Sequence, residues 1–340
     1  MKTAIFACAC NENLYIRDWV AYHITLGFDS IIIADNSPQN GGEYPERVLG
    51  DFIESGKVKV FDFRKKEPNP DLFQAALYTA AFWTFRELFD WIFFIDIDEF
   101  VTFNKNSGYN NVKDFLSLPE ISQAEQIKMN WMCMSDNDQL HYDSKPVWIR
   151  FPKSIEPIDN PDWWGKVPVN YTIKTAVNCN KTTRADFISS MSPHFPITDS
   201  RENTVCISPS GKSIFWKSAV ATLDYDVMFL RHYRTLTIEE FLFRRVLSQG
   251  DDNCMGGITG KETLKKLFCV DNKMTPEKEK IFDDFFMRFP RSEKDVLAPM
   301  SQQDDSDISE EEKAKKRRSA AVKLLITICE TFRNYLNLSN

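Results

Sequence analysis

The chain has 340 residues, of which 43% are hydrophobic and 13% aromatic, and its formal net charge is −7. This length and composition suffice for a large α/β domain with its own core, and the negative charge argues against a general nucleic-acid-binding surface. The eight cysteines include no C-x-x-C pair and no apolar span reaches 18 residues, so we expect free thiols in an intracellular protein that does not cross a membrane.

The first hundred residues alternate between apolar runs and amphipathic stretches. The expected strands cover residues 3–9, 30–34, 57–63 and 91–101, and the expected helices cover residues 13–27, 45–55 and 69–90. Asn13 and Asn69-Pro70 are suited to begin helices and Gly27 to end one. His23 falls on the apolar stripe of the first helix, which favours a hydrogen-bonded structural histidine over a metal ligand. The order predicts a doubly wound half-sheet.

An apolar strand runs directly into three carboxylates in the stretch WIFFIDIDEFV, residues 91–101. Such a run is typical of a strand buried on both faces, and parallel sheets bind ligands at the carboxyl ends of their strands. Strand alternation places Asp96 and Asp98 on one side, where clustered carboxylates repel one another unless a cation joins them. We therefore expect a divalent metal there. The alternative is a solvated acidic turn.

Asp35 ends the second expected strand and Arg64 follows the third. An acid at the end of a second parallel strand can accept hydrogen bonds from a ribose or a base, although an Asx-turn explains Asp35 equally well. The G-x-G-x-x-G motif of dinucleotide folds is absent. The phosphates of a nucleotide would therefore need to be held by another group, for which the metal is the first candidate.

The second half of the chain has a looser, β-rich pattern and then becomes helical. Strands are expected at residues 124–130, 146–151, 167–177, 204–208 and 225–233. Thr237 and Glu240 form a capping box that begins a helix. Residues 301–317 have the composition of a solvated linker. The last segment has an apolar stripe behind basic residues, and this helix could lie on an anionic membrane surface or pack back onto the domain. The stripe consists of Ala321, Leu325, Ile328, Phe332 and Tyr335.

Several of these motifs occur in a recognisable order within residues 3–250. They are Asn11-Glu12, Trp19, His23, Gly27-Phe28, Asp35-Asn36-Ser37, the stretch from Phe94 to Phe100, His232-Tyr233 and Glu239-Glu240-Phe241. Together they resemble glycosyltransferase family 92 and its bacterial relatives in the family 2-like GT-A group. The W-x-x-F-G segment of the family is kept only in part, as the stretch from Trp131 to Asp136.

The resemblance implies a GT-A fold, in which a Rossmann-like mixed sheet is flanked by helices, together with a nucleotide-sugar donor and Mn²⁺ or Mg²⁺. It implies that Asp98 binds the metal, that Asp96 contacts the metal or the donor ribose, and that a late histidine completes the metal site. His232 is the first candidate for that histidine and His194 the second. The residues expected to bind the donor are Asn11, Glu12, Asp35, Asn36, Arg64 and Asp96.

The expected activity is transfer of a sugar, with inversion, from a donor such as a UDP-sugar to a hydroxyl of a glycan or lipid-linked glycan in surface polysaccharide or lipopolysaccharide synthesis. A cation would stabilise the leaving diphosphate. Asp136 or Asp138 could act as the base, although both could be solvated loop residues. The alternatives are a non-catalytic sugar-nucleotide- or polysaccharide-binding protein and a haloacid-dehalogenase-type phosphatase. Phe100 argues against the phosphatase, which has Thr or Val at that position.

The expected domain order is linear. A GT-A catalytic domain covers residues 1–255, with a donor half at 1–102 and an acceptor half at 103–255. A helical extension at 256–300, a charged linker at 301–318 and an amphipathic helix at 319–340 follow. The expected location is cytoplasmic, with peripheral contact to the inner membrane face if the last helix binds lipid.

Overall fold

The computed structural model describes residues 1–37, 39, 43–64, 70–156, 158–159, 168–190, 192–247, 260–289 and 310–337. The chain divides into two compact units. The first combines Met1–Asn130, Thr172–Leu230 and Ser306–Asn340, and the second combines Trp131–Tyr171 and Arg231–Asp305. Each unit is thus assembled from separate stretches, which differs from the linear order expected from the sequence.

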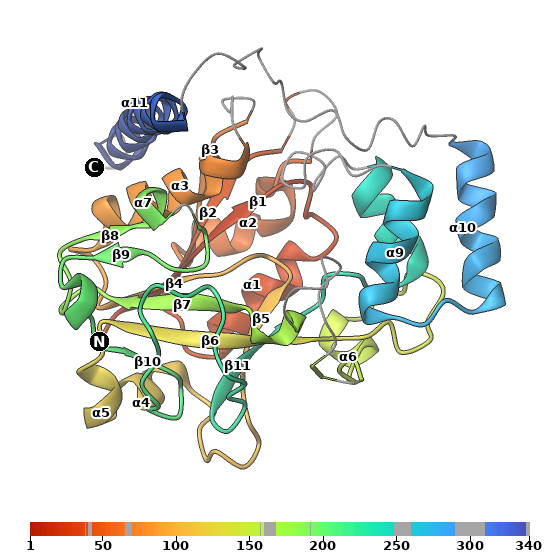
Figure 1. The fold of residues 1–340 in the computed structure, drawn as a ribbon, viewed down its shortest axis with the longest axis horizontal. Helices are drawn as coiled ribbons and strands as arrows, with labels where there is room; N and C mark the ends of the chain where they lie inside the picture. Colours follow the sequence, from red (N-terminus) through yellow and green to blue (C-terminus); the bar gives the residue numbers. More distant parts are fainter. Residues whose placement is uncertain are drawn as a thin grey trace. The chain divides into compact units, whose positions relative to one another are not determined.

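The first unit is built on a parallel half-sheet (Figure 1). Its strands are β1 (Thr3–Ala9), β2 (Ser30–Asp35), β3 (Val58–Asp62) and β4 (Trp91–Phe94), which lie in the order β3-β2-β1-β4 with every pair parallel. The connecting helices are α1 (Ile16–Thr25), α2 (Glu46–Glu54) and α3 (Pro70–Phe85). The expected β-α-β-α-β-α-β order is confirmed.

The sheet continues beyond β4 with further strands, of which the first, β7, is antiparallel to β4. The additional strands, in order from β4, are β7 (Ile173–Asn178), β6 (Gln126–Cys133), β11 (Met228–His232) and β5 (Glu99–Phe103), and β10 (Cys206–Ile207) pairs with β6. Strand β7 runs antiparallel to both β4 and β6. The expected mixed sheet flanked by helices is therefore confirmed.

The remaining helices, strands and turns complete the two units. The first unit contains α4 (Val112–Leu116), α5 (Pro119–Ser122), β8 (Ala185–Asp186), α7 (Phe187–Ser190), β9 (Ile197–Thr198), a 3-10 turn at Arg201–Asn203 and α11 (Glu310–Asn337). The second contains α6 (Val147–Arg150), a 3-10 turn at Val169–Tyr171, α8 (Ile238–Leu242), a π-helical turn at Phe243–Leu247, α9 (Lys261–Asp271) and α10 (Pro276–Arg288). None of the helices within the described residues is both long and apolar enough to span a membrane.

Two expectations about the ends of α1 have different outcomes. Its N-cap is Tyr15, without a side-chain capping bond, so the assignment of Asn13 as the cap is wrong. The Asn13 side chain instead donates a hydrogen bond to the carbonyl of Tyr44. Gly27 follows the helix at φ +104°, and a Cβ there would lie 2.6 Å from the Asn111 side chain. Both the backbone angle and the close approach therefore require glycine.

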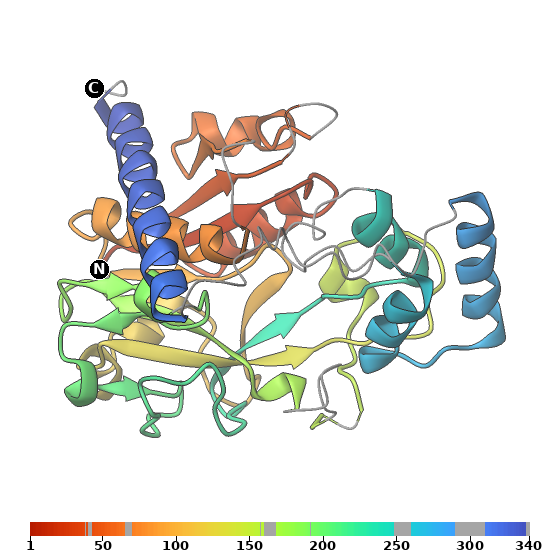
Figure 2. The same ribbon diagram turned by 45° about the horizontal axis from the view of Figure 1, so that its top comes forward.

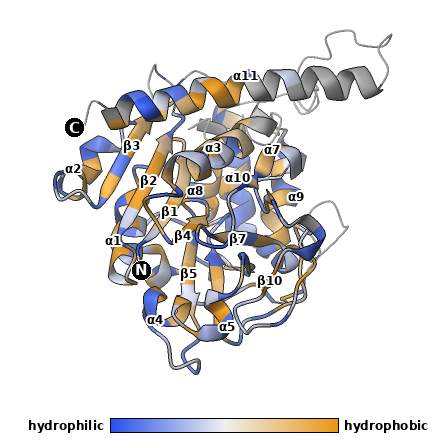
Figure 3. Ribbon diagram, turned by 90° about the vertical axis from the view of Figure 1, so that its left-hand side faces the viewer, coloured by the Kyte–Doolittle hydropathy of each residue, from blue (hydrophilic) through white to orange (hydrophobic). Residues whose placement is uncertain are grey.

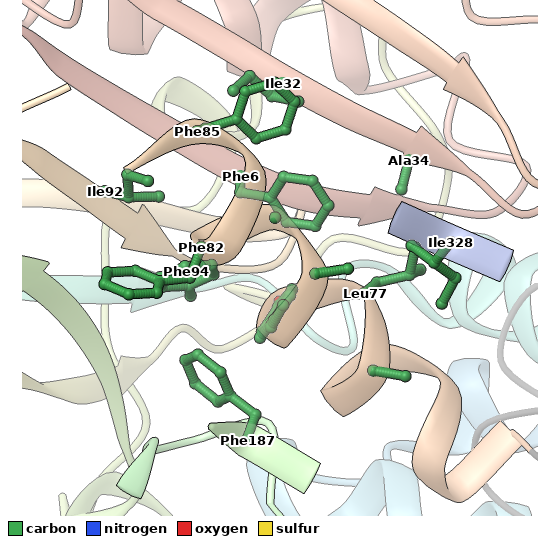
Figure 4. Packing of buried hydrophobic residues seen from close by; sticks show 14 of the residues in the cluster. Phe6, Ile32, Ala34, Leu77, Phe82, Phe85, Ile92, Phe94, Phe187 and Ile328 are labelled. Carbon is green, nitrogen blue, oxygen red and sulfur yellow. The ribbon is translucent and has the colours of Figure 1, made fainter. Parts of the chain in front are cut away.

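The main core of the first unit lies between the half-sheet and α3 (Figure 4). Phe6, Ile92 and Phe94 point from β1 and β4 toward Phe82 and other apolar residues of α3. Because strand residues alternate, the neighbouring residue Phe93 points to the other face, where its ring lies 4.9 Å from that of Phe28. The strands are thus buried on both faces, as their continuous apolar runs predict.

Helix α11 packs onto α3 and adds its apolar stripe to this core (Figures 2 and 3). Ile328 and Phe332 are 2% and 0% exposed, and Leu325 packs against the same cluster. Of the two alternatives for this helix, packing back onto the domain is the one observed for the described side chains. The side chains of Ala321 and Tyr335 lie outside the described residues. The helix begins at Glu310, so the linker expected at residues 301–318 extends too far at its C-terminal end. Residues 301–309 lie outside the described residues.

The second unit contains a strand prediction that is wrong. The strand expected at residues 146–151 is absent, and residues 147–150 form the short helix α6. Arg150 of this helix is buried and donates two hydrogen bonds to the carboxylate of Glu240, at 2.7 and 2.9 Å. The expected capping box of Thr237 and Glu240 is present at the start of α8. The same glutamate therefore caps α8 and binds the arginine of α6.

Candidate active site

The acidic stretch forms a tight turn at the carboxyl end of β4. The strand ends at Phe94, and β5 begins at Glu99. The backbone N–H of Asp96 donates to Oε2 of Glu99 at 2.9 Å, and the N–H of Glu99 donates to the carbonyl of Asp96 at 3.1 Å. Ile97 and Glu99 are buried, whereas Asp96 and Asp98 are partly exposed. The single strand expected over residues 91–101 is thus divided into β4 and β5, and Asp96 and Asp98 are the more exposed residues of the turn between them.

Three side chains hold the Asp96 carboxylate. Oδ1 accepts hydrogen bonds from Nε2 of Gln74 at 2.7 Å and from the hydroxyl of Tyr78 at 3.0 Å. Oδ2 forms an ion pair with Nζ of Lys174 at 2.8 Å. Gln74 and Tyr78 lie four residues apart on α3, so they share one face of the helix. Both oxygens of Asp96 are therefore engaged by the protein, and 31% of its side chain remains exposed.

The electrostatics of this cluster follow from burial and from the crowding of acids. Burial raises the pKa of Glu99 well above its ordinary value, and the charges of Asp96 and Asp98 add to the rise. Burial alone would lower the pKa of Lys174, but attraction to Asp96 and Glu99 outweighs it, and the net shift is upward. Burial and the charge of Asp96 also raise the pKa of Tyr78. Lys174 is therefore a stable ammonium ion, and Tyr78 keeps its proton.

The ends of β1, β2 and β3 contribute a second group of polar residues. Asn11 follows β1 at φ +56°, its N–H donates to the hydroxyl of Ser37 at 3.0 Å, and its side-chain oxygen accepts from the N–H of Glu43. The backbone carbonyl of Glu12 accepts the N–H groups that begin α1, and the N–H of Asn36 donates to the carbonyl of Ala9. The side chains of Glu12 and Asn36 are partly exposed.

Asp35 and Arg64 form a buried ion pair in this group. Nε of Arg64 lies 2.5 Å from Oδ2 of Asp35, and the two side chains are 3% and 1% exposed. Oδ1 of Asp35 accepts the N–H of Ser37, so the Asx-turn expected as an alternative is present. The ring of Tyr44 stacks on the guanidinium, with its centroid 3.6 Å from Cζ. Within the described part of the chain, Nη1 of Arg64 has no hydrogen-bond partner.

The two candidate histidines belong to different units. His194 is in the first unit, where its Nδ1 lies 2.9 Å from the carbonyl of Ile173. His232 is in the second unit, where it is 6% exposed, its ring lies 4.2 Å from that of Trp131, and its carbonyl accepts the N–H of Met134. Their role as metal ligands stays a prediction.

The two candidate bases have contrasting surroundings in the second unit. Asp136 is 2% exposed and forms an ion pair with the buried Nζ of Lys278 at 2.5 Å. Burial raises its pKa, although Lys278 opposes the rise. Asp138 is 85% exposed and lies 3.5 Å from the same ammonium. Asp136 thus resembles a structural ion-pair partner, and Asp138 is the more accessible of the two.

A divalent cation fits the D-x-D turn only if a bound substrate supplies part of its coordination shell. Across the described residues, no three His, Cys, Asp or Glu side chains are arranged to hold a metal ion. Asp96 is already held by Lys174, Gln74 and Tyr78. A hard cation commonly takes one or two carboxylates and completes its shell with water and substrate phosphates. The donor set therefore fits a cation held by Asp98 together with a diphosphate, rather than a cage of protein ligands.

Lys174, Gln74 and Tyr78 were not identified from the sequence as site residues. The available signal was Lys174 itself, a single lysine within the otherwise uncharged stretch YTIKTAV, residues 171–177. A lysine that is buried on a strand needs a carboxylate or several carbonyls as partners. The sequence does not say which partner that is.

The chain matches a known glycosyltransferase family and is similar in sequence to plant galactosyltransferases. The family model described as glycosyltransferase family 92 matches residues 7–245. The galactan beta-1,4-galactosyltransferases GALS2 and GALS3 of Arabidopsis thaliana are 32% and 30% identical over 143 and 135 residues, or 38% and 36% of this chain. These matches span only 27% and 26% of the relatives' own lengths. S. aureus TarS 1-349, for which a crystal structure exists, is 12% identical, with a TM-score of 0.35 and a match that covers 98% of this chain and 92% of TarS 1-349.

Proposed function

We propose that this chain, which belongs to glycosyltransferase family 92, transfers a sugar from a UDP-sugar to a hydroxyl of a glycan or lipid-linked glycan. The observation that carries the proposal is the D-x-D turn at the carboxyl edge of the parallel half-sheet, with Asp96 held in one orientation by Gln74, Tyr78 and Lys174. Nucleotides bind at this edge in open α/β sheets. Galactose is the first sugar to test, because the plant relatives are named as galactosyltransferases.

We assign the nucleoside of the donor to the ends of β1, β2 and β3. Asn11 and Asp35 follow or end two adjacent strands, and Arg64 lies beside Asp35. The guanidinium of Arg64 has a nitrogen, Nη1, without a partner in the described residues, and a base carbonyl or ribose oxygen would satisfy it. Glu12 and Asn36 are the remaining candidates for donor contacts in this region.

The cation in this proposal is Mn²⁺ or Mg²⁺, held by Asp98 and by the donor diphosphate, with His232 or His194 as a further candidate ligand. When bound, it would neutralise charge on the leaving diphosphate. Gln74, Tyr78 and Lys174 hold Asp96 in one orientation, and Asp96 is the candidate contact for the donor ribose. We propose Asp138 as the first candidate for the base and Asp136 as the second, because Asp138 is the exposed one of the pair.

A donor screen tests this function. Binding of UDP-galactose, UDP-glucose and GDP-, CMP- and dTDP-sugars is measured by calorimetry with and without Mn²⁺, and slow hydrolysis of each donor is followed without acceptor. We expect a UDP-sugar to bind and to be hydrolysed. Binding without hydrolysis under any condition would favour a sugar-nucleotide-binding protein instead.

The role of Asp98 is tested in the same assay. Asp98→Asn should weaken the Mn²⁺-dependent part of UDP binding by at least about tenfold, because it removes a charged oxygen ligand. Glu54→Gln, which changes an exposed acid at the end of α2, is the matched control and should bind UDP as the wild type does. Unchanged Mn²⁺-dependent affinity in Asp98→Asn would exclude Asp98 as a ligand.

A further inference from the structure

Lys174 is a buried cation on the central strand β7 of the mixed sheet. Its side chain is 1% exposed, and its Nζ lies 2.8 Å from Oδ2 of Asp96. Residue 174 directly precedes Thr175, which is paired with Phe94 at the end of β4. The strand pairing therefore fixes Lys174 beside the D-x-D turn.

A second buried lysine in the same sheet, Lys128, can be compared with Lys174. Lys128 on the neighbouring strand β6 is 0% exposed, and its Nζ donates hydrogen bonds to the carbonyls of Phe215, Trp216 and Ser218 at 2.7–3.0 Å. A buried ammonium in this sheet can thus be satisfied by backbone carbonyls alone. Lys174 instead pairs with a carboxylate of the candidate active site, which is not needed merely to bury a lysine.

The ion pair between Lys174 and Asp96 also affects the net charge of the D-x-D turn. Asp96, Asp98 and Glu99 place three acids within four positions, and a donor diphosphate would add further negative charge. The ammonium of Lys174 offsets part of this charge permanently, whether or not a metal is bound. Because Gln74 and Tyr78 fix Oδ1 of Asp96 while Lys174 fixes Oδ2, the carboxylate cannot rotate without breaking one of these contacts.

We propose that Lys174 is a positioning residue of the donor site, which acts through Asp96 to hold that carboxylate correctly oriented for the donor. This inference rests on the proposed function and adds a residue that the motifs do not contain. It also predicts that part of the affinity for the nucleotide is independent of metal and depends on Lys174.

The test uses variants of the full chain and UDP as the probe. Affinity is measured by calorimetry with Mn²⁺ and again with EDTA for the wild type, Lys174→Met, Lys174→Arg, Asp96→Asn and the double variant Asp96→Asn/Lys174→Met. We expect Lys174→Met to weaken UDP binding by roughly 10- to 100-fold under both conditions, the range typical of residues that orient a ligand group. Lys174→Arg, which keeps the charge, should recover part of that loss.

The double variant separates positioning from an independent contribution. If Lys174 acts through Asp96, the double variant should bind UDP no more weakly than Asp96→Asn alone, because the two losses are not additive. Neutralising both partners also avoids leaving one charge buried without its partner, so this variant remains measurable if Lys174→Met does not fold. Lys128→Met is the control for loss of a buried lysine and should change the unfolding midpoint without the tenfold loss of UDP affinity.

The outcomes distinguish this inference from the function on which it rests. A wild-type protein that binds no UDP would overturn the proposed function and the inference together. A wild type that binds UDP while Lys174→Met binds it equally well, or losses from Asp96→Asn and Lys174→Met that multiply in the double variant, would overturn the role of Lys174 alone.

Discussion

His23 of α1 is a buried histidine whose two ring nitrogens are both used by the backbone. Nε2 accepts the N–H of Val101 at 3.1 Å, so the proton is on Nδ1, which donates to the carbonyl of Trp19 at 2.9 Å. Burial lowers its pKa to about 3, although the bond to Trp19 opposes the shift. The expectation of a hydrogen-bonded structural histidine is confirmed.

This environment predicts a loss of stability in mild acid. The unfolded chain protonates His23 below a pH of about 6.5, whereas the folded chain resists protonation until the pH approaches its lowered pKa. The unfolded state therefore binds more protons. The free energy of unfolding decreases as the pH is lowered, by about 2 kcal/mol between roughly pH 7 and pH 5. Urea unfolding at both pH values should show a smaller difference for His23→Gln than for the wild type.

The exposed His141 provides the control for this experiment, since its side chain is 68% exposed. His141→Gln should keep the pH dependence of the wild type. An equal pH dependence in His23→Gln and the wild type would show that His23 is not the group responsible.

At the same scale, the sequence located the acids of the site but not the groups that hold them. Asp96 and Asp98 belong to one contiguous motif behind an apolar strand, so their place at the edge of the sheet could be predicted. Lys174 and Gln74 reach Asp96 from β7 and α3. Such convergence depends on strand pairing and helix packing, which a local pattern does not encode.

At the scale of elements, α11 shows both what periodicity can predict and what it cannot. The stripe through Ile328 and Phe332 was visible in the sequence, but a stripe does not name the surface that covers it. The strand predicted at residues 146–151 failed for a related reason. Its β-branched and aromatic residues favour a strand only weakly, and the observed helical turn carries Arg150, which is bound to Glu240.

Phe332 should contribute strongly to the stability of the first unit. It is 0% exposed, and its ring centroid lies 4.7–6.1 Å from those of Phe61, Phe63, Phe85 and Phe6. Phe332→Ala should reduce the free energy of unfolding by about 3–5 kcal/mol, because it leaves a cavity among these rings. Ile326 of α11 is 53% exposed, so Ile326→Ala should change the free energy of unfolding by less than about 0.5 kcal/mol. Equal unfolding midpoints for the two variants would show that α11 does not stabilise the core.

At the scale of the whole molecule, the folding units do not follow the order of the chain. The second unit joins Trp131–Tyr171 to Arg231–Asp305, and the first unit requires the C-terminal stretch Ser306–Asn340. The composition of residues 301–317 indicated a boundary near this point, and the chain does pass between units there. The sequence could not show that the helix beyond the boundary returns to the first unit, because that depends on contacts far apart in the chain.

A chain that ends at residue 255 should therefore fail to fold as an independent catalytic domain. In the second unit it lacks Lys278, which leaves the buried carboxyl of Asp136 without its cation, and loss of one partner of a buried pair costs about 3–5 kcal/mol. In the first unit it lacks Phe332, whose loss alone costs a similar amount. Together these losses approach the 5–15 kcal/mol typical of whole domains.

We expect the truncated chain to keep much of its far-UV circular dichroism while losing the near-UV signal and binding the dye ANS, since secondary structure can outlast side-chain packing. A chain that ends at residue 337 keeps α11 whole and should unfold cooperatively, as the full chain does. If the chain ending at residue 255 also unfolds cooperatively, with the midpoint of the full chain, then neither Lys278 nor α11 is needed for folding. The linear domain order would in that case be sufficient for a folded catalytic domain.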